Sequence, residues 1–484
     1  MKQNFSSSAP ERVARQRVHV PVSLTVIGCW VALALVLGTL ASFFVPPLKS
    51  PDEADHLRRA YMLSQGQWLL HTQSCEGENT FCRQNRTMSG GPVDQGLQDY
   101  LLRRDYGRVR KESEEVVRST QALDWTGTED FGITPGTGYY FPLIYLPQAV
   151  GLKLGKLLHF SVEHSYRLVR FLNLLAGVAV VALAVSIHRL PLSVLATLLL
   201  PMSLFQAVSA SIDLLATALA LLALSCFMRL RRVPDQPVAA LDPRVVPLFI
   251  LLCVALFVAI TARAHFAPML LLPLLLAWWE RRPVLWVCLG LTVLAVAAWM
   301  ATALPATVDF RIVRSVSTGE VVRFYLQEPG HLFAVLANTL TDSGRLNFYR
   351  NSFLGAFGET FLSRDSYLVL VVLLGVVLVM SLPGWRQMRQ DALARAMLIV
   401  TGLSAGLLAF LAMLFTWTPH PAQVVEGVQG RYLLIPVILV LMGVVSWQVP
   451  GSRVAFGQRL AMVILALVSS VLSIKGVLSA FYHL

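Results

Sequence analysis

The chain has 484 residues, of which 55% are hydrophobic and only 14% are charged, and its mean hydropathy is +0.61. A water-soluble core cannot enclose that much apolar surface, so the composition excludes an ordinary soluble protein. The formal net charge of +12 comes mainly from the expected cytoplasmic loops and from scattered external arginines, so it indicates membrane topology, and we assign no nucleic-acid partner.

Apolar runs long enough to cross a bilayer recur along the whole chain. A hydrocarbon layer about 30 Å thick requires roughly 20 helical residues, because each helical residue advances about 1.5 Å. The first run is too long for the apolar core of a signal peptide, and we expect it to be an uncleaved span. Together the runs predict an all-α polytopic membrane protein with about eleven transmembrane helices, near residues 22–45, 166–188, 191–208, 211–230, 245–262, 266–279, 284–303, 366–382, 397–416, 431–449 and 458–478.

Positively charged residues set the predicted orientation, because short cytoplasmic loops of membrane proteins collect Lys and Arg. The N-terminal tail carries Lys2, Arg12, Arg15 and Arg17 against the single acid Glu11. We therefore place this tail in the cytoplasm, the segment after the first span outside and, with eleven spans, the C-terminus outside. The same count places four further Arg-rich loops in the cytoplasm, around residues 229–232, 280–282, 386–395 and 453–459.

The predicted spans divide the chain into six parts. We expect short helices from the two external parts to cover a cavity at the outer membrane surface. The parts are a cytoplasmic tail at 1–21, the first transmembrane helix at 22–45, an external loop with juxtamembrane helices at 46–165, a transmembrane bundle at 166–303, a second external segment at 304–365 and a C-terminal transmembrane bundle at 366–484.

The external loop opens with Ser-Pro-Asp-Glu-Ala-Asp-His at residues 50–56. Ser50 as N-cap, Pro51 at the first helical position and Glu53 at the third predict a capping box and a helix that begins at the outer membrane surface. Asp52 and Glu53 could serve only to complement the helix dipole. Alternatively they are carboxylates held at the level of a lipid headgroup, with His56 on the same helical face.

No cofactor is indicated firmly by the sequence. Asp52, Glu53 and His56 offer oxygen and imidazole ligands that a divalent cation could use, although helical spacing of this kind is common by chance. We found no zinc spacing, P-loop or dinucleotide fingerprint.

Two further features lie within the external loop. Cys75 and Cys82 predict a disulfide if this loop faces an oxidising compartment; the alternative is two unpaired thiols. Residues 94–118 carry many charges of both signs with a few apolar residues, which predicts an interfacial helix.

An aromatic, proline-interrupted stretch at residues 138–147 ends the same loop, and the charge count keeps it on the outer side. Tyr139, Tyr140 and Tyr145 are typical of the aromatic belt at a membrane interface. They could also stack on a sugar or steer a polyprenyl chain.

The order of these motifs resembles a bacterial membrane family catalogued as a domain of unknown function, which is similar in architecture to the type C (GT-C) membrane glycosyltransferases. The resemblance covers nearly the whole chain and implies a polyprenyl-phosphate-linked sugar as donor, an acidic residue of the first external loop as base, and an active site facing the periplasm of the bacterial inner membrane. The matching residues are Pro51, Asp52, Glu53 and His56, then Tyr139, Tyr140, Pro142, Leu143 and Tyr145, and finally Gln429, Gly430, Arg431, Tyr432 and Pro436.

Sugar transfer from a lipid phosphate also requires cations that stabilise the leaving phosphate. Arg263, in a Thr-Ala-Arg-Ala-His stretch that ends at His265, and Arg431, before Tyr432, lie at outer span ends, where the positive-inside tendency does not explain them. Arginine suits bidentate phosphate recognition, but both side chains could instead reach towards lipid headgroups. Asp213 begins a span at the same side, where it could face the site or only cap a helix.

Asp52 and Glu53 point about 100° apart on a helix, so only one of them can address an acceptor proton. We expect Asp52 to be the base and Glu53 to be the capping residue.

The acceptor is a glycan, a lipid or a protein, and membrane lipids surround the chain. Three other functions stay open: a lipid-linked saccharide transporter or flippase, an oligosaccharide polymerase or ligase, and a non-catalytic scaffold.

Overall fold

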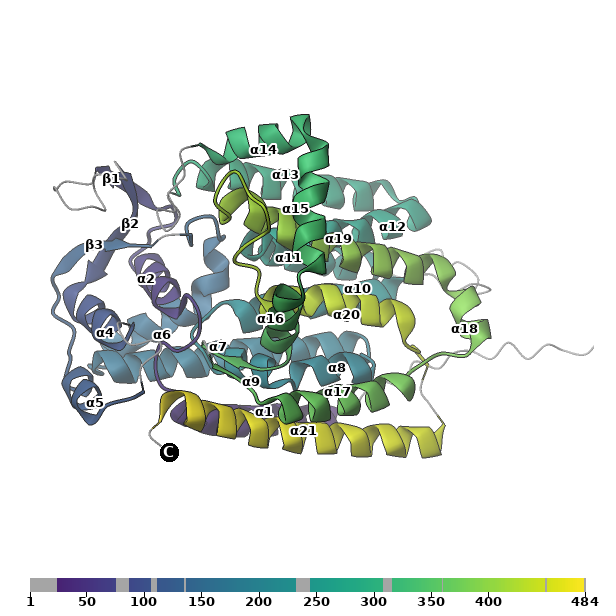
Figure 1. The fold of residues 1–484 in the computed structure, drawn as a ribbon, viewed down its shortest axis with the longest axis horizontal. Coiled ribbons are helices and arrows are strands. Elements are labelled where there is room, and N and C mark those ends of the chain that lie inside the picture. Colours follow the sequence, from purple (N-terminus) through teal and green to yellow (C-terminus); the bar gives the residue numbers. More distant parts are fainter. Residues whose placement is uncertain are drawn as a thin grey trace, which may run out of the picture.

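The computed structural model describes residues 24–74, 87–105, 111–134, 136–231, 244–307, 316–358, 360–448 and 451–482. Most of these residues are helical, and the longest helices run side by side along one direction (Figure 1). The predicted class, an all-α polytopic membrane protein, is confirmed. The N-terminal tail with its predicted cytoplasmic charges, and the cysteines Cys75 and Cys82, lie outside the described residues.

Within the described residues, 7 helices are long and apolar enough to cross a membrane. Their burial differs greatly: the apolar window of α1 is 0% buried, whereas 72% of the window of α10 is buried. Thus α10 is central to the bundle and α1 lies at its lipid-facing edge. The seven are α1 (Leu24–Phe44), α7 (Val162–Ile187), α10 (Asp213–Leu230), α11 (Val245–Ala262), α13 (Pro283–Ala303), α19 (Ala392–Thr416) and α21 (Ser452–Phe481).

The other four predicted spans are helical but are short or broken. Pro201 begins a new helix after a break, because proline lacks the amide hydrogen that would continue the preceding one. Pro268 lies in a 3-10 turn that opens another of the four. These segments are α8 (Leu192–Leu198) with α9 (Pro201–Ala207), η2 (Ala264–Leu270) with α12 (Leu271–Glu280), α17 (Arg364–Val379), and η3 (Gly430–Leu433) with α20 (Leu434–Val444).

The external loop covers one end of the bundle, at the left of Figure 1. The predicted interfacial helix over 94–118 is two helices, α4 and α5. A three-stranded antiparallel sheet in the order β1-β2-β3 accompanies the helices, and the sequence analysis did not predict it. The elements are α2 (Glu53–Ser64), β1 (His71–Ser74), β2 (Thr87–Asp94), α4 (Gln95–Asp105), α5 (Glu114–Gln121), β3 (Glu129–Ile133), η1 (Pro142–Tyr145) and α6 (Leu146–Leu157).

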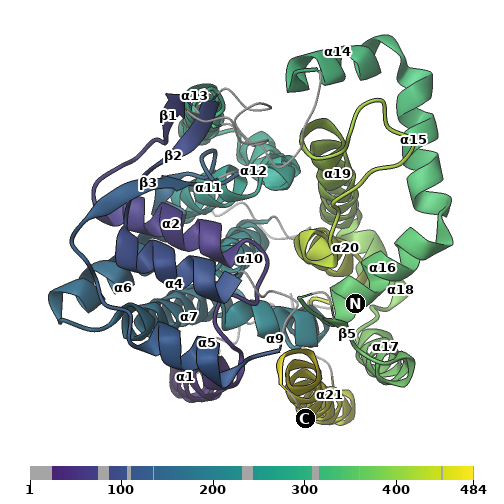
Figure 2. The same ribbon diagram turned by 60° about the vertical axis from the view of Figure 1, so that its left-hand side comes forward.

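The second external segment forms three consecutive helices, α14 (Thr318–Gln327), α15 (Pro329–Thr341) and α16 (Ser343–Leu354). In Figure 2 they follow one another around the side of α19 and α20. A capping box between Ser317 and Glu320 starts α14, and β4 (Ala356–Phe357) pairs with β5 (Thr360–Phe361) after α16. The short helix α18 (Trp385–Gln390) lies at the opposite end of the bundle from α2 (Figure 1).

One buried apolar cluster joins the external layer to the bundle. Leu57 of α2, Tyr145 of η1, Val169 of α7 and Leu221 of α10 all belong to it and are almost fully buried. Because close-packed interiors deform little, the start of α2 is held rigidly against the outer ends of the spans.

Candidate functional site

The start of α2 departs from the predicted capping box. Ser50 does not cap the helix, because its hydroxyl donates to the side-chain oxygen of Gln206 at 2.9 Å. The Ser50 amide does donate to the Glu53 carboxylate at 3.3 Å, so half of the expected pair forms. The helix begins two residues later than predicted, with Asp52 at its N-cap and Glu53 as its first residue.

Glu53 is a buried structural carboxylate. Its side chain is 0% exposed and accepts hydrogen bonds from the Tyr166 hydroxyl at 2.7 Å and the Ala210 amide at 2.6 Å. The Arg170 guanidinium lies 3.5 Å away. Glu53 therefore ties α2 to α7 and to the segment before α10.

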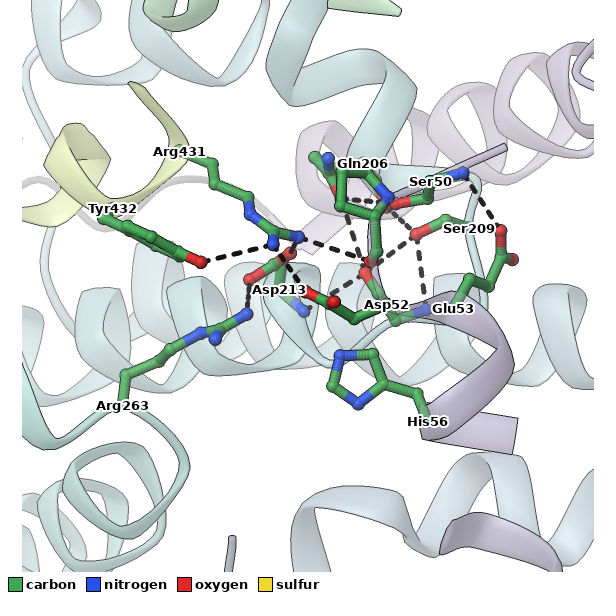
Figure 3. Close-up of polar contacts among 12 residues, drawn as sticks. Ser50, Asp52, Glu53, His56, Gln206, Ser209, Asp213, Arg263, Arg431 and Tyr432 are labelled. Carbon is green, nitrogen blue, oxygen red and sulfur yellow. Dashed lines mark hydrogen bonds and ion pairs between the residues drawn. The ribbon is translucent and has the colours of Figure 1, made fainter. Parts of the chain in front are cut away.

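Asp52 faces a different partner. It is in the left-handed backbone region, with φ 61°, and its side chain is 33% exposed. Its carboxylate accepts from the Arg431 guanidinium at 2.8 Å. Figure 3 shows Asp52 turned towards Arg431 and Glu53 turned away from it. The two adjacent acids thus lie in separate environments, as expected for separate roles.

Four charged side chains form one continuous chain of ion pairs. Arg263 binds one carboxylate oxygen of Asp213, and Arg431 binds the other at 3.1 Å. Arg431 also pairs with Asp52 (Figure 3). We call this arrangement of Arg263, Asp213, Arg431 and Asp52 the charge chain. Its members come from the end of α11, the start of α10, η3 and the start of α2. Both guanidinium groups therefore face carboxylates of the protein, and the alternative of arginines reaching out to lipid is wrong.

Two tyrosine rings line the charge chain. The Arg263 guanidinium carbon lies 5.7 Å from the ring centres of both Tyr140 and Tyr432, and that of Arg431 lies 5.2 Å from Tyr432. These distances are within the range of cation–π attraction. Tyr139 is connected to the charge chain through Tyr140: the two rings pack edge-on, with their centres 4.9 Å apart.

His56 is 2% exposed and its Nδ1 lies 2.9 Å from the Tyr145 hydroxyl. Burial lowers the pKa of His56 to about 4, although the Asp52 carboxylate opposes this shift. His56 is therefore a neutral hydrogen-bonding group at physiological pH. Burial also raises the pKa of Tyr145 well above its ordinary value, so its phenol stays protonated.

The ring of His265 lies 6.0 Å from that of Tyr432. Its Nε2 atom is buried and has no hydrogen-bond partner within the described chain. With His265, all eleven residues that the sequence singled out are placed. Apart from Glu53, which is buried behind the helix start, they belong to the charge chain or connect to it through ring or hydrogen-bond contacts.

A metal centre is not assembled from these residues. Within the described ranges, no three His, Cys, Asp or Glu side chains converge as a metal site would require. Asp52 and His56 lie near each other, but Glu53 directs its carboxylate to Tyr166 and Arg170. The suggested cation ligands therefore do not form one set.

The sequence analysis missed Arg170, which organises the region behind the site. Its guanidinium donates to the backbone oxygens of Ser42, Val45 and Pro46, which follow or end α1, at 3.1, 2.7 and 2.9 Å. It also pairs with Glu53. An arginine inside an apolar span is an available signal for such a role, because a charge there is retained only with partners.

The fold and site define a polytopic helical membrane protein with an ordered cluster of arginines, carboxylates and tyrosines at one end of its bundle. The family model "Predicted membrane protein (DUF2142)" matches residues 35–442. The chain belongs to this family, which confirms the predicted relation to a membrane family of unknown function.

Among solved structures, the chain is similar to ArnT from Cupriavidus metallidurans bound to undecaprenyl phosphate. The two share 16% sequence identity with a TM-score of 0.40, over 92% of this chain and 64% of that chain. The chain thus spans less than two thirds of the length of that protein, and so distant a likeness says nothing about activity. No curated protein matches the chain.

Proposed function

We propose that the protein is a membrane glycosyltransferase. It transfers a sugar from a polyprenyl-phosphate donor to a hydroxyl group of a glycan, lipid or protein acceptor at the outer face of the bacterial inner membrane. The observation that carries this proposal is the charge chain, in which two arginines suited to a phosphate lie beside a partly exposed carboxylate suited to a base.

The arginines supply the phosphate site. A guanidinium group matches the geometry of phosphate oxygens and can bind them bidentately. The side chains of Arg431 and Arg263 are only 5% and 10% exposed, so water screens their charges weakly. Asp213 contacts both guanidinium groups and fixes them relative to each other, which makes it a positioning residue.

Asp52 supplies the base. Its carboxylate takes the proton of the acceptor hydroxyl while the hydroxyl oxygen forms a bond to the anomeric carbon of the sugar. The bond between that carbon and the phosphate oxygen breaks, and its electron pair leaves with the polyprenyl phosphate, whose charge Arg263 and Arg431 stabilise. A single displacement of this kind inverts the configuration at the anomeric carbon.

The Arg431–Asp52 ion pair sets the order in which the two substrates bind. A donor phosphate competes with Asp52 for the Arg431 guanidinium. When the phosphate binds, Asp52 loses part of its stabilising partner, and its carboxylate becomes a stronger base. Donor binding therefore prepares the base for the acceptor, and we expect the donor to bind first.

The test is transfer by the purified protein in lipid nanodiscs, supplied with the polyprenyl-linked sugars and with the envelope glycans, lipids and proteins of cells that lack the protein as acceptors. We expect those cells to accumulate a lipid-linked sugar and the purified protein to consume it, releasing polyprenyl phosphate. If lipid-linked sugars are the same with and without the protein, and the purified protein consumes none, the proposal fails.

A further inference from the structure

A pocket of about 340 Å³ lies between α16 and the loop that leads into η3. Arg345, Phe348 and Tyr349 line it from α16, and Glu426 and Gln429 line it from the loop. This pocket is not part of the charge chain, and no step of the proposed chemistry uses it.

Hydrogen bonds hold the two walls of the pocket together. The Arg345 guanidinium donates to the backbone oxygen of Val425 at 3.0 Å, and the Gly430 amide donates to the Ser352 hydroxyl at 2.8 Å. Gly430 permits this approach, because a side chain there would meet the backbone nitrogen of Phe353 at 2.1 Å. The pocket is therefore formed before any occupant arrives.

The lining has the chemistry of a site for a neutral polyhydroxylated ligand. Phe348 is 41% exposed and offers an aromatic face to the C–H side of a sugar ring. Arg345, Glu426 and Gln429 supply hydrogen-bond donors and acceptors. The charges of Arg345 and Glu426 cancel, so the lining has no net positive charge that would attract an anion.

Tyr349 adds a buried hydroxyl beside Arg345. It is 7% exposed, and within the described chain its hydroxyl hydrogen has no acceptor, since the nearby Arg345 can only donate. Burial raises the pKa of Tyr349, and the nearby Arg345 only partly opposes the shift, so the phenol remains a neutral donor. A buried hydroxyl whose hydrogen has no acceptor is unfavourable, and a ligand oxygen would accept it.

The pocket also lies close to the charge chain. Gln429 lines the pocket and is separated from Arg431 only by Gly430, which α16 holds in place. A chain-like ligand that fills the pocket would thus lie beside the segment that carries Arg431.

We propose that this pocket binds the acceptor and that the acceptor is a neutral saccharide chain. This inference rests on the proposed glycosyltransferase function and narrows its acceptor from glycan, lipid or protein to glycan.

The experiment measures two affinities in nanodiscs. One probe is a fluorescently labelled mixture of neutral oligosaccharides released from the envelope of the producing bacterium, and the other is undecaprenyl phosphate. Phe348→Ala and Glu426→Gln should each weaken oligosaccharide binding about tenfold and leave polyprenyl phosphate binding unchanged. Arg431→Ala should do the reverse. Phe333→Ala, which removes a 71% exposed aromatic side chain from α15 outside the pocket, is the matched control.

The two proposals fail in different ways. If the wild-type protein binds polyprenyl phosphate but no oligosaccharide, or if Phe348→Ala behaves like Phe333→Ala, the acceptor pocket is wrong and the donor site stands. If oligosaccharide binds with the expected sensitivity and polyprenyl phosphate does not bind, the pocket stands and the proposed donor is wrong.

Discussion

Asp52 holds its carboxylate in place through an uncommon backbone conformation. A non-glycine residue in the left-handed region costs about 1–3 kcal/mol and persists where the surroundings enforce it, often at functional sites. Here the Asp52 carbonyl accepts from the His56 amide at 3.0 Å in the first turn of α2. Asn tolerates the left-handed region as well as Asp does, so Asp52→Asn changes the charge without disturbing the backbone.

The first prediction follows from this conservative exchange. Asp52→Asn should reduce sugar transfer at least about 100-fold, because the amide cannot accept the acceptor proton. The thermal midpoint of the purified protein should stay within a few degrees of the wild-type value. Asp99→Asn, in an exposed position of α4, is the control and should keep full activity. Wild-type transfer by Asp52→Asn would show that Asp52 is not the base.

The second prediction concerns Glu53, which keeps the expected contact with the Ser50 amide and adds a buried ion pair with Arg170. Glu53→Gln leaves the buried Arg170 without its carboxylate, and breaking a buried ion pair costs about 3–5 kcal/mol. We expect a lower thermal midpoint and less protein in the membrane, but measurable transfer per folded molecule. A variant with wild-type stability and no activity would instead assign the base to Glu53.

The third prediction is a pH dependence of stability that His56 causes. Its pKa falls from 6.5 to about 4 on folding, so between these values the unfolded state binds more protons. The free energy of unfolding is therefore unaffected by His56 above pH 6.5, and it decreases as the pH falls towards 4. The charges that face His56 are Asp52, Asp213, Arg263 and Arg431, and none of them is altered in the test.

The measurement is the thermal midpoint in nanodiscs at pH 7 and pH 5. His56→Asn should show a smaller decrease between these conditions than the wild-type protein does. An equal decrease in both proteins would assign the pH dependence to other groups.

At the scale of elements, the charge chain is made entirely from the ends of helices. Arg263 follows α11, Asp213 begins α10 and Arg431 lies in the turn before α20. Helix ends at a membrane surface can carry charges that the interior of a span cannot. The elements therefore bring together residues more than two hundred positions apart, and each element fixes one member of the site.

The fourth prediction compares two changes at Arg431. Arg431 contacts Asp52 and Asp213 with different nitrogens, and lysine has only one nitrogen with which to do so. Arg431→Ala should reduce transfer about 100- to 1000-fold, whereas Arg431→Lys retains a charge and should lose about tenfold. Arg118→Ala, whose side chain is 80% exposed, is the control. Full activity of Arg431→Ala would leave Arg263 as the better candidate for the phosphate.

The sequence was sufficient to predict the elements whose position depends on hydropathy and charge. Long apolar runs predicted the spans. Arg263, Asp213 and Arg431 lie at span ends, and the span count placed all three on the same side of the membrane. The sheet was not predictable, because β2 contains Gly-Gly-Pro and has no apolar alternation. The Ser50 half of the capping box did not form, for a non-local reason: the Ser50 hydroxyl that would have capped the helix donates to Gln206, far along the chain.

At the scale of the whole molecule, each end of the bundle carries a cluster of ion-paired side chains. The charge chain lies at the end covered by the external layer, and α18 lies at the other end (Figure 1). Near α18, Arg231 pairs with Asp391 at 2.6 Å, and Arg231 and Arg395 each lie 4.1 Å from the ring centre of Trp447. A transporter would instead concentrate ionisable groups near the middle of the membrane.

The last prediction assigns these ends to the two sides of the membrane. Alkaline phosphatase, which is active only outside the cytoplasm, should be active when fused after Glu112 or Glu320 and inactive when fused after Gln236 or Gln390. A fluorescent protein that matures only in the cytoplasm should give the opposite pattern at the same four positions. The physical basis is that loops rich in Lys and Arg stay in the cytoplasm, as predicted for the regions around Gln236 and Gln390.

Glu112 is the decisive position, because it belongs to the layer that covers the charge chain. Its carboxylate pairs with Arg104 at 2.5 Å and with Lys49 at 3.4 Å, and Lys49 lies three residues before Asp52. The side of the membrane on which Glu112 lies is therefore the side on which Asp52 lies. If the fusion after Glu112 is active only as a cytoplasmic reporter, the base faces the cytoplasm, and an outward-facing polyprenyl-linked donor cannot reach it. If it is active only outside, Asp52 and the lipid-linked donor share the compartment that the proposed reaction requires.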